Sequence, residues 1–147
     1  MIGGTADRGG IAILAVALLG VGISVYLTVA HYTQTAPACL GVGAIDCSAV
    51  TTSSFSLVPG TEIPITFLGL LWFFVSGTAG FAILTDREPS WLRVAHLAWV
   101  GAGLLVVLYL VYAELVVINR ICEWCTAVHV LVLTTFLIAL RRVQKAE

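Results

Sequence analysis

Four long apolar segments constrain this chain more than any other feature of its sequence. They run approximately over residues 11–31, 65–85, 94–118 and 122–140. A helix of about 20 residues crosses a hydrocarbon core of about 30 Å, so each segment is long enough to span a membrane. The sequence therefore predicts an all-α membrane protein, built as a four-transmembrane-helix bundle.

The composition supports this fold class. Hydrophobic residues make up 60% of the chain and charged residues 10%, with a mean hydropathy of +1.06. A soluble domain usually carries about 25% charged residues. The net charge of −1 argues against a nucleic-acid-binding surface, which needs clustered Lys and Arg. We expect a single membrane domain over residues 1–147, surrounded by lipid.

The basic residues predict the orientation of the bundle, because Lys and Arg accumulate in cytoplasmic loops. One set flanks the chain ends and the link between the second and third segments: Arg8, Arg87, Arg93, Arg141, Arg142 and Lys145. Only Arg120 falls on the other side. Both termini are therefore predicted to be cytoplasmic, with an external loop over about 32–64. The first apolar segment exceeds the 7–15 residues of a signal-peptide core, so we expect no cleavage at Ala36–Ala38.

With this topology, all cysteines lie on the non-cytoplasmic side, where disulfides persist. Cys39 and Cys47 are in the loop, and Cys122 and Cys125 begin the fourth span. Cys122, Cys125 and His129 share one helix face, because their spacing is three and four residues. A thiol in the first turn of a helix has a lowered pKa, which favours the reactive thiolate.

Three kinds of site fit these cysteines. A zinc site needs four close ligands, and Cys39 and Cys47 are spaced more widely than a zinc-binding pair, so no metal is predicted. Two structural disulfides are a second possibility. Redox exchange between the pairs is the favoured interpretation.

The loop between the first two spans has two parts. Gly41 and Gly43 predict a flexible tether that lets Cys39 and Cys47 meet or separate. The following stretch, 47–60, predicts a short interfacial helix ended by Pro59 and Gly60, with Val50, Phe55 and Leu57 on its membrane face. An irregular interfacial loop is the alternative.

These features together resemble the vitamin K epoxide reductase family, in its compact prokaryotic form without a fused thioredoxin-like domain. The resemblance lies in the loop cysteine pair followed by Ser48, in Ile63-Pro64 leading to the Phe67–Leu70 stretch, and in ICEWC with His129 four residues later. It implies a bundle that encloses a quinone: ubiquinone, menaquinone or a vitamin K-like naphthoquinone. It also implies a separate thioredoxin-like (DsbA-like) partner.

The resemblance assigns a role to each site residue. Cys39 would exchange with the partner, Cys47 would pass electrons to Cys122, and Cys125 would face the quinone. Ser53 matches a loop Ser or Thr near the active centre, and His129 matches a position that contacts the quinone head group.

The predicted function is therefore a quinone-dependent thiol oxidoreductase that generates disulfides. It would lie in a bacterial or archaeal cell (inner) membrane, with its active site on the non-cytoplasmic side. One alternative is a membrane scaffold or small transporter with structural disulfides, and another is the same relay run in reverse. Glu114 is interpreted as a solvated interfacial carboxylate, with a proton-handling role as the alternative. Asp46 and Glu123 are interpreted as surface charges.

Overall fold

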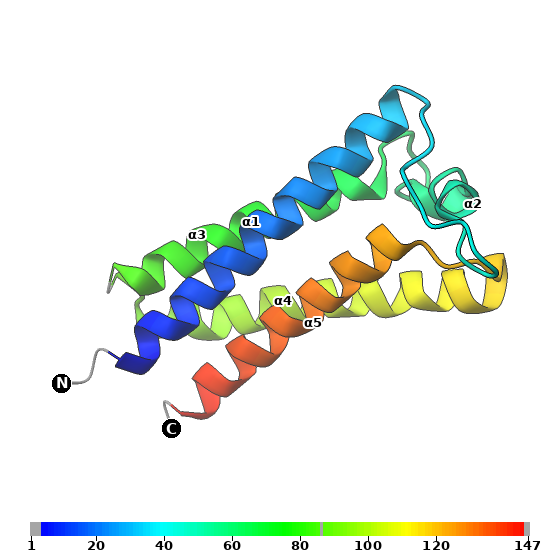
Figure 1. Cartoon of the computed structure of the whole chain (residues 1–147). Helices are drawn as coiled ribbons and strands as arrows, with labels where there is room; N and C mark the ends of the chain where they lie inside the picture. Colours follow the sequence, from blue (N-terminus) through cyan, green and yellow to red (C-terminus); the bar gives the residue numbers. More distant parts are fainter. Residues whose placement is uncertain (1–3, 86, 146–147) are drawn as a thin grey trace.

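The computed structural model describes residues 4–85 and 87–145, and four long helices dominate it (Figure 1). They are α1 (Gly4–Tyr32), α3 (Ile65–Leu84), α4 (Ser90–Tyr112) and α5 (Glu123–Gln144). The helix of α4 continues as a π-helical segment, η2 (Ala113–Ile118). Each of the four spans is long and apolar enough to cross a membrane, which confirms the predicted fold class.

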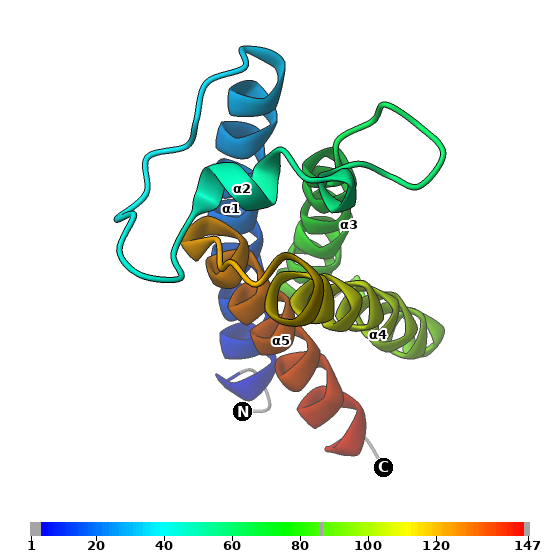
Figure 2. The same ribbon diagram turned by 90° about the vertical axis from the view of Figure 1, so that its right-hand side faces the viewer.

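The helices pack in two pairs, α1 on α3 and α4 on α5, with further contact between α1 and α5. The start of α1 and the end of α5 lie at the same end of the bundle (Figure 1). At the opposite end, the short helix α2 (Cys47–Thr51) lies across the ends of the long helices (Figure 2). The loop between α1 and α3, and with it all four cysteines, therefore lies at the end of the bundle away from the start of α1 and the end of α5.

Small residues allow the helices to approach closely. A Cβ added at Gly20 of α1 would overlap the ring of Phe73, and one added at Gly103 of α4 would overlap the indole of Trp72. Trp72 and Phe73 belong to the main apolar core, together with Val100, Val107, Val132 and Ala139. Small side chains commonly permit this kind of helix packing in membranes.

The predicted interfacial helix is present but short. Asp46 caps α2 by accepting a hydrogen bond from Ala49 N–H at 2.9 Å. The helix ends at Thr51, and after it the Ser53 hydroxyl donates to the Val50 carbonyl; such side-chain bonds compete with helical ones. A 3₁₀ turn, η1 (Ser54–Ser56), follows. The expectation that Val50 faces the membrane is wrong, because Val50 is buried against Cys47 and Cys122.

An ion pair joins α5 to the residues before α4, at the end opposite the cysteines. Arg142 donates two hydrogen bonds to Glu88, at 3.0 and 2.7 Å, and Arg93 lies 3.7 Å from the same carboxylate. Burial alone would raise the pKa of Glu88, but the two arginines outweigh it and hold this pKa below its ordinary value of 4.5.

We expect Glu88→Gln to lower the free energy of unfolding by about 1–3 kcal/mol, because Arg142 loses a charged partner. Since the folded-state pKa of Glu88 is lowered, its contribution is present above the ordinary pKa and is lost as the pH falls through the folded-state value. Thermal unfolding in detergent, at neutral pH and at a pH below 4.5, measures this effect. The native chain should lose more stability on acidification than the variant, and equal losses would contradict the assignment.

Candidate functional site

The four cysteines gather in two pairs at the end of the bundle where α2 lies. Cys39 and Cys47, the loop pair, form a disulfide, and Cys122 and Cys125, the inner pair, are free thiols. Cys47 is 1% exposed and Cys122 is fully buried, and the two belong to one apolar cluster with Val50. Cys47 of the loop pair is therefore packed together with Cys122 of the inner pair.

A short backbone ladder brings these two cysteines together. Ile121 donates its N–H to the Ala44 carbonyl at 2.9 Å, and Asp46 donates its N–H to the Ile121 carbonyl at 3.0 Å. Each of the two segments that it joins leads directly into a cysteine, Cys47 on one side and Cys122 on the other. The ladder thus fixes the position of the loop pair relative to the inner pair.

The residues on either side of Cys39 are also held in place. Trp124 donates its indole N–H to the Ala38 carbonyl at 2.5 Å, and the Ala38 N–H donates to the Tyr26 hydroxyl at 2.8 Å. Leu40 donates its N–H to the Glu123 carboxylate at 3.2 Å. Glu123 and Trp124, the two residues between Cys122 and Cys125, therefore both bind the backbone next to Cys39. The loop segment that was predicted to be a flexible tether is held against the start of α5.

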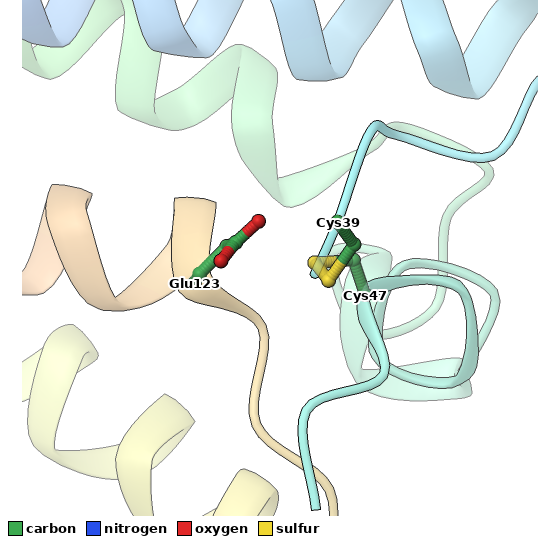
Figure 3. Close-up of side chains that lie close together, drawn as sticks. All are labelled: Cys39, Cys47 and Glu123. Atoms are coloured by element: carbon green, nitrogen blue, oxygen red, sulfur yellow. A yellow bond between two sulfur atoms is a disulfide. The ribbon is translucent and has the colours of Figure 1, made fainter. Parts of the chain in front are cut away.

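Two acidic residues next to cysteines lie at the surface, partly exposed, and also make structural contacts that the sequence does not predict. Asp46 caps α2, and Glu123 binds the loop beside the disulfide (Figure 3). A carboxylate oxygen of Glu123 and the sulfur atoms of Cys39 and Cys47 lie within 4.8 Å of one another. Zinc binds thiolates, and these sulfur atoms are joined in a disulfide, so this group does not offer a zinc site in its present redox state.

Cys122 is the thiol whose surroundings favour the thiolate. It occupies the N-cap of α5, where the Cys125 N–H donates to its sulfur at 3.3 Å. A hydrogen bond from the Cys125 thiol lowers the pKa of Cys122 most strongly, and backbone donors add to this effect against the opposing effects of burial and Glu114. These contacts favour the thiolate of Cys122 over that of Cys125 when the inner pair is reduced.

An apolar cavity of about 340 Å³ lies inside the bundle next to the inner pair. Cys125 lines it, and so do the other two predicted ligand-binding residues, Ser53 and His129. Its walls are mostly apolar and include Leu27, Trp72, Phe73, Trp99, Val107 and Val132. The structure thus places Ser53, Cys125 and His129 around one space, whereas Cys122 does not line it and is buried with Cys47 and Val50.

Glu114 also lines this cavity, which contradicts its interpretation as a solvated interfacial carboxylate. The residue is 6% exposed, whereas the apolar side chains of Leu115, Val116 and Val117 that follow it are exposed. It lies near the start of η2, and π-helical segments are frequent at functional sites. The sequence carries a signal for a functional role of Glu114, because an acid within an apolar span is a functional candidate by default.

The comparison with family models agrees with the fold and the cysteine arrangement. The model of the vitamin K epoxide reductase family matches residues 11–140 of the chain. The chain therefore belongs to this family, whose members are membrane oxidoreductases that act on thiols. A comparison with curated proteins finds no match.

Proposed function

We propose that this member of the vitamin K epoxide reductase family is a quinone-dependent thiol oxidoreductase that generates disulfides in a partner protein. One observation carries the proposal: the inner pair lies between the loop cysteines and the apolar cavity. Cys122 and Cys125 both pack in the buried cluster that contains Cys47, and Cys125 also lines the cavity, which Cys122 does not. A pair in this position is suited to carry electrons from the loop cysteines to a ligand in the cavity.

The proposed route has three steps. A dithiol of the partner attacks the Cys39–Cys47 disulfide, so that the partner is oxidised and the loop pair is reduced. Cys47 then attacks Cys122 of an oxidised inner pair, which restores the loop disulfide and leaves Cys122 and Cys125 reduced. A reduced inner pair beside a loop disulfide corresponds to the stage after this second step. Closure of the Cys122–Cys125 disulfide then releases two electrons to the quinone.

The cavity supports a quinone as the electron-accepting substrate. Its volume of about 340 Å³ lies in the range typical of small-molecule sites, and its apolar walls suit an aromatic ring. His129 is buried at the cavity wall one turn beyond Cys125, where an imidazole N–H can donate to a carbonyl oxygen of the ring. This donor would stabilise the negative charge that develops as the ring is reduced. Ser53 would close the cavity from the loop side.

The outer surface supports a separate thioredoxin-like partner. Cys39 is more exposed than Cys47, so it is the sulfur that an external thiolate can reach. A polar surface hollow beside it is lined by Gly41, Gly43 and Arg120, among others. The distribution of basic residues supports placing this face on the non-cytoplasmic side of a prokaryotic cell membrane.

The alternative of a membrane scaffold with structural disulfides is less well supported. A scaffold of this kind gives no reason for the thiol of Cys125 to line an apolar cavity. The direction of electron flow depends on the reduction potentials of the pairs.

The roles of the two pairs predict a separable defect. We expect Cys39→Ala to abolish turnover with a reduced thioredoxin-like donor, because the donor has no accessible sulfur to attack. The same variant should still reduce quinone when its inner pair is first reduced by a small thiol. Anaerobic assays of donor oxidation and of quinone absorbance measure the two activities. Loss of both activities, or of neither, would contradict the proposed route.

A further inference from the structure

Glu114 is the part of the cavity that the proposed route does not use. It is an acid inside a membrane-spanning segment, 6% exposed, and it lines the same cavity as Cys125 and His129. Burial of an acid within a span is energetically costly, so a structural role alone explains this residue poorly.

The redox chemistry of the inner pair leaves a proton to be supplied. Reduction of a quinone to a hydroquinone takes two electrons and two protons. A Cys122 thiolate and a Cys125 thiol supply both electrons when they close their disulfide, but they carry only one proton. An acidic group that faces the cavity is in position to supply the second proton.

We propose that Glu114 is the proton donor that supplies this second proton. A thiolate, a thiol, a carboxylic acid and a quinone then become a disulfide, a carboxylate and a hydroquinone, which balances atoms, electrons and charge. The inference rests on the proposed function, and it adds a catalytic role for a residue outside the four cysteines.

The position of Glu114 also provides for its own reprotonation. The residue begins the final turn before the outer loop, and its backbone carbonyl accepts hydrogen bonds from the N–H groups of Asn119 and Arg120. Both of those residues are exposed. The carboxyl group is therefore within a few residues of the aqueous face while its side chain lines the cavity. After each turnover, a proton from water on that face restores the acid.

The first test is a single-turnover assay on the full chain in detergent, with the inner pair reduced and a soluble quinone added. We expect Glu114→Gln to slow quinone reduction by about 10²-fold or more, which is the usual effect of removing a general acid. Glu114→Asp should recover part of the rate, because it restores an acid. Glu62→Gln is the matched control, since Glu62 is an exposed loop acid. Quenching of tryptophan fluorescence by the quinone should show unchanged binding in all three variants.

The second test does not depend on activity. Infrared spectra of the reduced, quinone-free protein are recorded in H₂O and in D₂O, and one is subtracted from the other. The difference should contain the carbonyl band of a protonated carboxylic acid, which shifts on deuteration. The band should be absent in Glu114→Gln and present in Glu62→Gln. If this band is missing in the native protein, or if Glu114→Gln reduces quinone at the native rate, the inference is overturned. If the native protein reduces no quinone, the proposed function itself fails.

Discussion

A variant with Cys39→Ser and Cys125→Ser should form a disulfide between Cys47 and Cys122 in most molecules under mild oxidation. The two remaining sulfur atoms belong to one buried cluster, and the ladder between Asp46 and Ile121 holds their backbones together. Each has lost its usual partner, so a crossed disulfide is the closest product available. Non-reducing digestion and mass spectrometry should identify the crossed peptide.

The control for this experiment is a variant with Cys39→Ser and Cys122→Ser, which leaves Cys47 with Cys125. Cys125 lies one turn further into α5 and lines the cavity, so we expect its crossed disulfide to form more slowly and to a lower final yield. Equal yields in the two variants would show that the packing of Cys47 against Cys122 does not direct exchange. Free thiols in both variants would contradict the relay itself.

Replacement of Cys125 by alanine has the second large expected effect. Quinone reduction should fall to the background rate of the buffer, because Cys122 alone cannot close a disulfide with its inner partner. The loop pair should still exchange with a thioredoxin-like donor, since Cys39 and Cys47 are intact. Stopped-flow absorbance measures quinone reduction, and thiol labelling measures exchange.

A suitable control is Ser48→Ala, because Ser48 is an exposed neighbour of the loop cysteine and lies outside the apolar cavity. It should keep the native rate of quinone reduction. Native-like quinone reduction by Cys125→Ala would exclude the assignment of this sulfur to the quinone side.

The spans and the grouping of the cysteines could be predicted from the sequence, because both depend on simple periodicities. Apolar runs of sufficient length determine the helices, and the spacing of Cys125 and His129 places them along one helix face, whereas Cys122 is the N-cap just before the helix. The resemblance to a known family then suggested Ser53 as a cavity residue. The structure brings Ser53, Cys125 and His129 around one cavity, and their contact with a quinone stays a prediction.

The contacts that join distant segments could not be predicted in this way. The ladder between Asp46 and Ile121 joins residues far apart in the sequence through backbone groups, which carry no side-chain signal. The hydrogen bond from Trp124 to Ala38 is similar, because its acceptor is a carbonyl. Glu114 was misplaced for another reason: its depth along the span suggested the interface, whereas its side chain points into the bundle.

The central claim is that the inner pair transfers electrons to a quinone, and one anaerobic stopped-flow measurement tests it most directly. The native protein is reduced, freed of reductant and mixed with a soluble quinone, while quinone absorbance and free thiols are followed together. The account predicts that each quinone reduced consumes two thiols, and that these are Cys122 and Cys125. No reduction of quinone, or reduction that persists after all four cysteines are alkylated, would contradict it.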